Sequence, residues 1–518
     1  MGRKLPIFYN ALMLTGVNLL LRLVSTSFQV FISGRIGAAG VGLLQLVMSV
    51  AMMTTTAGMA GIRTATMYLA AEELGKGRAQ NVTWVLSSCF LYSFLFSGFV
   101  GVLVYGFAPW IAEFWIGDLR VAGAIRLFAA FLPVNCFVGV MVGYFTAANR
   151  IATLAGVEVA EQLCSMAVTT AALLCWAKSD IGLACQSVVL GSCAGGILTL
   201  SCLVILRMRE RAPRGCKISV MPRLADTALP LAVADDLKVG INTVENLMVP
   251  KRLALFTEGA LAQFGMVSGM VFPLMMFPAA ILYGLADLLI PEMARCNASG
   301  GRGRIRYLTR RTLRIACIYG IFCGGVINLC ADSLCQRLYD SAQAGEYLRW
   351  YSLLVPMLYC DLVIDAMNKG LGKQKICVRY NIMTAILDVA GLYVLLPIMG
   401  MRGYYISFFI SHAVNATLSL RLLLRTANVR VRLYVPVLAV AAMGAAIGGA
   451  ALLQNDGARC LAFGLLLAGL LVLFDVLRME DARWFLGLLR MKKTMQKNSK
   501  FLKKVFDKWG KTMYNTWA

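Results

Sequence analysis

The fold of this chain is decided by residues 10–45, which read NALMLTGVNLLLRLVSTSFQVFISGRIGAAGVGLLQ. A helix of about 20 apolar residues can cross a bilayer, and this segment is long enough to do so. It nevertheless carries Arg22 near its middle, where a charge costs at least roughly 3 kcal/mol on insertion scales. Because such a charge is tolerated only where it faces protein or a water-filled cavity, the segment predicts a membrane helix with one polar face.

The polar residues of this segment are spaced at intervals of four, three and four positions, namely Asn18, Arg22, Ser25 and Gln29. That spacing places them on one side of a helix. A stripe led by an arginine is typical of a cavity wall, so we expect Arg22 to bind an anionic substrate, with Asn18 and Gln29 beside it. The alternative is that Arg22 pairs with a buried carboxylate and only fixes the packing.

The composition predicts an all-α polytopic membrane protein. The chain has 518 residues, of which 59% are hydrophobic, and a mean hydropathy of +0.72. Its apolar runs indicate about fourteen transmembrane helices. We place these spans at 7–32, 41–71, 82–110, 122–147, 154–177, 181–206, 226–249, 261–290, 308–331, 347–368, 377–398, 402–424, 433–453 and 459–477.

The net charge of +24 does not indicate a nucleic-acid partner, because the basic residues are concentrated in alternate joints between the spans. The positive-inside rule then predicts a multi-pass protein of the bacterial cytoplasmic membrane with both termini in the cytoplasm. Lys251 and Arg252 are the exception, since they fall at an expected outer joint. No metal site, cofactor or oligomer is indicated, and we expect a monomer.

An internal repeat divides the chain. Arg22 and Arg35 in the first span are matched by Lys238 and Lys251 in the seventh, at the same separation. We therefore expect two parallel six-helix lobes with a substrate site between them, as in other transporters built from repeats. The expected parts are an N-terminal lobe, a basic linker, a C-terminal lobe, two added helices and a basic tail, at 1–206, 207–225, 226–425, 426–480 and 481–518.

The seventh span is the most polar. Lys238, Asn242 and Glu245 share one helical face with Asp235. Lys238 is therefore a second candidate cation for substrate binding, with Asn242 beside it, and Arg63 in the second span is a third. An internal Asp235–Lys238 pair, three residues apart, is the alternative.

Several acidic residues lie within apolar runs and are candidates for a coupling-ion site, namely Asp235, Glu245, Asp361 and Asp388. Inward movement of one charge down a membrane potential contributes about 2.3 kcal/mol per 100 mV, which can drive transport. The sequence does not distinguish Na⁺ from H⁺. For His412, the only histidine, we expect a packing role.

Several motifs together resemble a known family. They are IGAAGVGLLQ at 36–45, GYF at 143–145, EQL at 161–163, VPKRL at 249–253, FPL at 272–274, LIP at 289–291 and GLGKQK at 370–375. Their order and spacing resemble the stage V sporulation protein B branch of the multidrug/oligosaccharidyl-lipid/polysaccharide flippase superfamily. The resemblance implies a V-shaped, two-lobed transporter that moves a polyprenyl-pyrophosphate-linked sugar by alternating access. Lipid II flippases commonly carry a second arginine one to two turns after the position of Arg22, where this chain has Phe28 and Gln29.

Other functions fit the sequence less well. A drug/cation antiporter of the same superfamily would favour about twelve spans and an acidic cavity. A membrane glycosyltransferase or ligase needs acid, base or metal-binding groups on a sizeable loop, and the joints here are short. A sporulation scaffold that does not transport is also compatible. In the tail, Phe501, Phe506 and Trp509 alternate with lysines, which predicts a helix lying on anionic lipids, or else a disordered basic tail.

Overall fold

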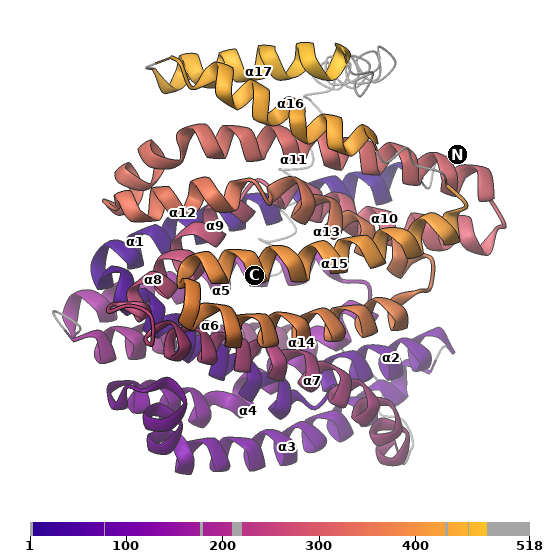
Figure 1. The fold of residues 1–518 in the computed structure, drawn as a ribbon. Helices are drawn as coiled ribbons and strands as arrows, with labels where there is room; N and C mark the ends of the chain where they lie inside the picture. The colour runs from indigo at the N-terminus through magenta and orange to yellow at the C-terminus, as the bar shows by residue number, and fades with distance from the viewer. Residues whose placement is uncertain are drawn as a thin grey trace, which may run out of the picture. The chain divides into compact units, whose positions relative to one another are not determined.

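A computed structural model describes residues 4–76, 78–176, 180–209, 220–429, 434–453 and 455–473. The tail 481–518 lies outside these ranges, and so does the side chain of Asn18. Within them all regular structure is helical (Figure 1). The α-helices are α1 (Lys4–Met59), α2 (Ile62–Gly75), α3 (Val82–Trp110), α4 (Ala122–Ala147), α5 (Ile151–Cys175), α6 (Ile181–Met208), α7 (Met221–Leu253), α8 (Ala260–Gly265), α9 (Phe272–Met276), α10 (Ala280–Ala298), α11 (Arg302–Tyr339), α12 (Ala342–Ser352), α13 (Val355–Gly370), α14 (Gln374–Met399), α15 (Met401–Ala427), α16 (Tyr434–Ala450) and α17 (Asp456–Leu473).

Most of these helices are suited to a membrane. Among the described residues, nine helices are long and apolar enough to cross one, or eleven if each of two bent pairs is one span. Helix α7 contains the expected seventh span but is too polar to be counted, and α16 is too short. A multi-pass membrane protein is therefore supported, while the number of fourteen spans stays a prediction.

The first two expected spans form a single long helix with a kink. Helix α1 is interrupted at Gly37, which has φ 69° and ψ 176°. This is a backbone conformation that glycine adopts without steric cost, whereas an L side chain there is strained. The glycine-rich joint predicted from the sequence is therefore a kink within α1.

Helix breaks also occur in the expected second and eighth spans. Ala60 and Gly61, both with positive φ, separate α1 from α2. In the eighth span a π-helical turn (Met266–Val271) precedes α9, and a 63° bend next to Pro278 separates α9 from α10. Proline lacks the amide hydrogen that continues a helix, which accounts for the bend next to Pro278.

One bend was not predicted. The sequence suggests one continuous span at 347–368, but the structure has α12 and α13 bent by 55°. Pro356 lies in the first turn of α13, where a missing amide hydrogen is tolerated because no helical acceptor is available for it. The apolar run continues through the bend, which is why hydropathy does not detect it.

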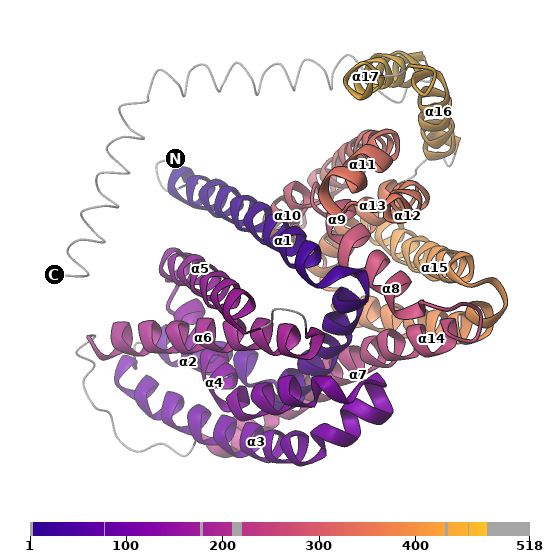
Figure 2. The ribbon, with the colours of Figure 1, turned by 90° about the vertical axis from the view of Figure 1, so that its left-hand side faces the viewer.

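The chain forms two compact units, Met1–Val431 and Arg432–Ala518. In the second unit α16 packs against α17. In the first unit α3, α4, α5 and α6 pack together, and α11, α12, α13, α14 and α15 form a second group, with α1 passing between them (Figure 2). The boundaries of the two six-helix lobes stay predictions.

Helix α1, which passes between the two groups, crosses α8, and the contacts there are reciprocal. A Cβ atom on Gly42 would lie 2.3 Å from the Leu261 carbonyl oxygen. A Cβ atom on Gly265 would lie 2.1 Å from the Ala38 carbonyl oxygen. Both distances are far below van der Waals contact, so only glycine allows these two backbones to approach so closely.

The two basic residues that depart from the positive-inside pattern have carbonyl partners. The Lys251 ammonium donates to the Phe114 carbonyl, beyond the end of α3. The Arg252 guanidinium donates to the Tyr393 carbonyl on α14 at 3.1 Å and lies over the Tyr393 ring. These contacts join the end of α7 to both groups of helices, which explains why cations occur at this joint.

Candidate functional site

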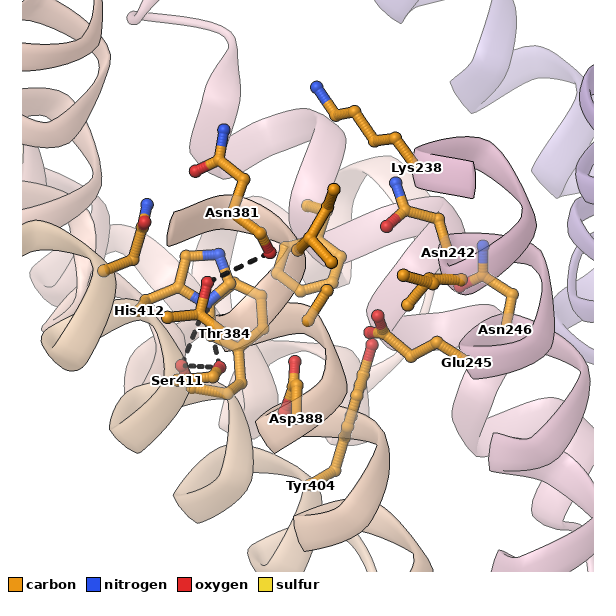
Figure 3. Close-up of a pocket in the computed structure, with 16 residues that line it drawn as sticks. Lys238, Asn242, Glu245, Asn246, Asn381, Thr384, Asp388, Tyr404, Ser411 and His412 are labelled. Atoms are coloured by element: carbon orange, nitrogen blue, oxygen red, sulfur yellow. Dashed lines mark hydrogen bonds between the residues drawn. The ribbon is translucent and has the colours of Figure 1, made fainter. Parts of the chain in front are cut away.

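A polar cavity of about 330 Å³ lies among α7, α9, α14 and α15 (Figure 3). Hydrophilic side chains make up most of its wall. They are Lys238, Asn242, Glu245, Asn246, Asn381, Thr384, Asp388, Tyr404, Ser411, His412 and Asn415. Such a polar cavity suits water or a polar ligand, since buried polar groups without partners are costly.

Helix α7 contributes the residues that its polar stripe predicted. Lys238, Asn242 and Glu245 all line the cavity. Figure 3 shows the Glu245 carboxylate pointing toward the Tyr404 hydroxyl, with Lys238 at the other end of the cavity. Among the described residues, none donates a hydrogen bond or pairs a charge to Glu245. Its carboxylate is therefore available to a ligand.

Helix α14 contributes a second carboxylate. Asp388 is only 4% exposed, and the Ser407 hydroxyl of α15 donates to its Oδ1 at 2.6 Å. That bond fixes the orientation of one carboxylate oxygen. Asp388 and Glu245 face the same cavity, and two carboxylates that share a site repel each other unless a proton or cation lies between them. The arrangement therefore favours binding of one positive charge.

Helix α15 packs aromatic and amide groups on the opposite wall. The His412 ring stacks on Phe408 with centroids 3.9 Å apart, and its Nδ1 lies 2.9 Å from the Phe408 carbonyl. His412 is thus held by packing, as expected, although it also lines the cavity. Asn415 donates to Asp361 Oδ2 at 3.1 Å, which ties Asp361 to the cavity wall without making it a lining residue.

The cations expected in the substrate site are not gathered in this cavity. Lys238 lines it, and no ion pair joins Lys238 to Asp235 or to another described residue. Arg22 is half-buried, with its guanidinium 5.0 Å from the centre of the Tyr283 ring. It too has no ion pair among the described residues, so the structure offers no carboxylate for the packing alternative. Arg63 is exposed on α2.

Gln29 instead makes a contact between distant segments. Its Nε2 donates to the Gly269 carbonyl in the π-helical turn at 2.9 Å. The structure therefore brings together Lys238, Asn242, Glu245 and Asp388, whereas Arg22, Arg63, Gln29 and Asp235 lie outside the cavity lining. The assignment of substrate-binding and ion-coupling roles to these residues stays a prediction.

Several lining residues were not singled out from the sequence. Asn381 and Thr384 precede Asp388, which was a candidate, at intervals of three and four on α14, and this stripe could have been found by the criterion used for α7. Tyr404 and Ser411 carry no such signal, since each lies in an apolar run. No group of three histidine, cysteine, aspartate or glutamate side chains suited to a metal occurs in the described part of the chain.

The sequence is similar to a polysaccharide biosynthesis family and a sporulation protein, and the fold is similar to that of known transport proteins. Residues 7–228 match the family model of the polysaccharide biosynthesis proteins. The chain is 22% identical over 416 residues to stage V sporulation protein B of Bacillus subtilis (strain 168), with 76% of this chain and 78% of that protein covered. The fold is similar to that of the lipid II flippase MurJ in an inward closed conformation, with a TM-score of 0.66, 12% identity and coverage of 90% of this chain and 98% of that chain.

A second solved structure is an inward-facing multidrug resistance MATE family transporter of the MOP superfamily. It matches with a TM-score of 0.64 and 14% identity over 80% of this chain and 98% of that chain. The resemblance stated from the sequence and the expected fold class are thus confirmed. The chain is a membrane protein whose described residues form a helical fold similar to these transporters, and the solved relatives are transporters and a flippase rather than enzymes.

Proposed function

We propose that this protein is a flippase that moves a polyprenyl-pyrophosphate-linked oligosaccharide or peptidoglycan precursor across the bacterial cytoplasmic membrane by alternating access. Its product would serve spore-cortex, cell-wall or surface-polysaccharide synthesis. The similarity to a stage V sporulation protein B and to a lipid II flippase supports this class of substrate. The number of basic residues in the joints supports an orientation with both termini in the cytoplasm.

The observation that carries the proposal is a pair of cations on expected membrane helices, neither of which has a carboxylate partner among the described residues. Neither Arg22 nor Lys238 forms an ion pair with a described residue. A cation at membrane depth is costly unless an anion or water compensates it. The pyrophosphate of a lipid-linked sugar supplies such an anion, and the arginine fork can bind its oxygens with two parallel hydrogen bonds.

A coupling ion is the second part of the proposal. Glu245 and Asp388 would bind one Na⁺ or H⁺ in the cavity, with Asp361 and Asp235 outside its lining as further acidic groups. A cation that enters along the membrane potential contributes about 2.3 kcal/mol per 100 mV for each charge moved. Because the cavity also contains Lys238, binding of the cation and of an anionic head group would influence each other electrostatically.

A second candidate function is supported by the same cavity. Glu245 has no partner among the described residues, and an unpaired carboxylate in a membrane cavity suits an organic cation. A drug/cation antiporter would use Glu245 in this way and would not need Arg22. The two functions therefore differ in which charge they require.

Transport by the full-length protein in liposomes tests the proposal. The probe is a fluorescent polyprenyl-pyrophosphate disaccharide, and its accessibility to a membrane-impermeant reagent reports flipping. Arg22→Ala should reduce flipping by at least about tenfold, the effect of losing one charge-assisted contact. Arg22→Lys should retain only part of the flipping activity, because the charge remains while the two parallel hydrogen bonds of the guanidinium are lost.

Arg126→Ala is the matched control, because Arg126 also lies over a tyrosine ring, that of Tyr105. It should leave flipping and protein level unchanged. Normal flipping by Arg22→Ala at normal protein level would reject the flippase proposal for this site. Cation-driven export of an organic dye that survives Arg22→Ala but not Glu245→Gln would favour the antiporter.

A further inference from the structure

Helix α7 contacts α1 directly beside the cavity. Asn246 Nδ2 donates to the Ser49 hydroxyl of α1 at 3.0 Å. The Thr243 hydroxyl lies 3.2 Å from the Ser49 carbonyl, but also 2.9 Å from the Val239 carbonyl of its own helix. A hydroxyl has only one hydrogen, so Thr243 shares it between two acceptors. Asn246 therefore provides the stronger side-chain bond between the two helices at this level.

The direction of the Asn246 bond follows from the other partner of Ser49. The Ser49 hydroxyl donates to the Gln45 carbonyl at 2.9 Å. Its hydrogen is thus already used, and its oxygen can only accept from a neighbour. The group that Asn246 presents to α1 must therefore be its NH₂, which leaves the amide oxygen on the other branch of the side chain.

Asn246 is also a lining residue of the cavity, next in sequence to Glu245. No described residue donates a hydrogen bond to its Oδ1. An amide oxygen is a good ligand for a hard cation such as Na⁺. The Asn246 side chain thus combines an oxygen that can bind a cation in the cavity with an NH₂ group that donates to α1. Figure 3 shows Asn246 beside Glu245.

We propose that Asn246 couples cation binding in the cavity to the contact between α1 and α7. Its Oδ1 would bind the cation together with Glu245 and Asp388, while its NH₂ holds Ser49. A cation on the amide oxygen withdraws electrons from the nitrogen and makes its N–H groups stronger donors, as hydrogen-bonded chains polarise one another. Cation binding then strengthens the α1–α7 contact.

This inference rests on the proposed cation site and adds the contact through which that site would act on α1. Thermodynamic linkage makes the coupling reciprocal, so loss of the Ser49 contact should also weaken cation binding. Asn246 is thus a positioning residue for α1 as well as a ligand. The titratable groups around it are Lys238 and Glu245 on α7, Asp388 on α14, and Tyr404 and His412 on α15.

A cysteine pair can report the α1–α7 contact in the full chain. Met53 on α1 and Gly240 on α7 line one apolar crevice of about 340 Å³, and a Cβ atom on Gly240 meets nothing within 4 Å. We would combine Met53→Cys and Gly240→Cys in a background without the native cysteines. The rate of cross-linking by a bifunctional thiol reagent is measured with and without Na⁺ at fixed pH, and between pH 5 and 8 without Na⁺. Equilibrium ²²Na⁺ binding is measured on the same samples.

In the parent pair, Na⁺ or protons should change the cross-linking rate about fivefold or more, a typical size for allosteric coupling. Ser49→Ala should abolish this response and weaken cation binding. Asn246→Asp should still bind the cation but lose the response, because it keeps an oxygen ligand and loses the donor. Thr55→Ala is the matched control, since the Thr55 hydroxyl lies on α1 like that of Ser49 but donates to the Ala51 carbonyl of its own helix at 2.8 Å. It should keep the response.

Two results overturn the inference in different ways. Cation binding with a full response in Ser49→Ala and Asn246→Asp shows that the coupling does not pass through this amide, while the proposed cation site stands. A parent pair that neither binds Na⁺ nor responds to pH removes the cation site itself, and the inference with it. Flipping of the lipid-linked probe, measured separately, then shows whether the flippase proposal survives without a coupling ion.

Discussion

The same acid–hydroxyl contact occurs in both groups of helices with different surroundings. On α5, Glu161 Oε2 accepts from the Thr199 hydroxyl of α6 at 2.7 Å. On α14, Asp388 Oδ1 accepts from the Ser407 hydroxyl of α15 at 2.6 Å. In each case a carboxylate on one helix is fixed by a hydroxyl on the helix that follows and packs against it.

The surroundings decide what each contact can do. Glu161 is packed against Gly195 of α6, whose Cβ position lies 3.1 Å from the Glu161 Cγ atom. Asp388 faces a cavity that Glu245 enters from a third helix. The acid nearest to Glu161 in sequence, Glu158, lies on the same helix, whereas Asp388 shares a cavity with a carboxylate from another helix. The comparison teaches that the proposed cation site would depend on α7 rather than on the acid–hydroxyl contact itself.

The largest effect should come from disrupting the close crossing of α1 and α8. Gly265→Val would place a Cβ atom within 2.1 Å of the Ala38 carbonyl and 2.5 Å of the Gly42 nitrogen. Backbone atoms cannot move aside as a flexible side chain can, so we expect a loss of about 3 kcal/mol or more and little folded protein. Protein level and thermal unfolding in detergent measure this.

Gly98→Val on α3 is the control for that change, because nothing lies within 4 Å of its Cβ position. It should change the unfolding temperature little. A Gly265→Val protein with wild-type stability would mean that α1 and α8 do not approach each other so closely in the membrane.

The second prediction tests the difference between the two carboxylates directly. Glu245→Gln and Asp388→Asn should each weaken cation binding at least about tenfold, because each removes a charged ligand. Both proteins should remain folded, since the amide keeps the volume of the side chain. Glu161→Gln should leave cation binding unchanged. Equilibrium ²²Na⁺ binding and the pH dependence of flipping measure these effects, and equal losses in all three variants would remove the distinction between the two groups.

The third prediction compares the two hydroxyl groups that donate to these carboxylates, those of Thr199 and Ser407. Thr199→Val should lower the free energy of unfolding by about 1 kcal/mol, the typical cost of one buried hydrogen bond, with cation binding unchanged. Ser407→Ala should cost a similar amount and, in addition, weaken cation binding severalfold, because Asp388 would lose the bond that orients it. Unfolding and binding are measured on the same samples. If Thr199→Val impaired binding as much as Ser407→Ala, α5 and α6 would also have to contribute to the site.

Local patterns in the sequence predicted the parts of this site that one helix determines. The stripe of Lys238, Asn242 and Glu245 was found because helical periodicity is visible in any short window. The joint between the first two expected spans coincides with the kink at Gly37, although one continuous helix was not expected. An Asp365–Lys369 pair, four residues apart on α13, is another contact that one helix determines, with a distance of 2.6 Å.

Contacts between distant segments could not be read in this way. Gln29 was assigned to the cavity from its stripe, but its partner is a carbonyl 240 positions away in a π-helical turn. Tyr404 faces Glu245 because the fold brings α15 and α7 to the same cavity (Figure 3). The sequence around Tyr404 contains no pattern that predicts this contact. The π-turn and the α12–α13 bend depend on tertiary packing, which composition does not report.

The smallest effect on stability is expected at a third acid, Asp118, which lies between two spans. Its partner is the Arg120 guanidinium rather than a hydroxyl group. Asp118 accepts from Arg120 Nη2 at 2.6 Å and from the Arg120 backbone nitrogen at 3.0 Å. The hydrogen bonds from the Arg120 side chain lower the pKa of Asp118. A lowered pKa in the folded state means that the contribution to stability is present above the ordinary pKa of about 3.9 and is lost as the pH falls below it.

Asp118→Asn should therefore reduce stability at pH 7, by no more than about 0.5–1 kcal/mol because the pair is largely solvent-exposed and screened. The difference between the two proteins should shrink as the pH falls below about 3.9 and vanish only below the lowered pKa of the folded-state carboxylate, where wild-type Asp118 is protonated as well. Unfolding temperatures measured from pH 7 to pH 3 in detergent test this sign. A difference that grows as the pH falls would mean that the charge of Asp118 destabilises the fold.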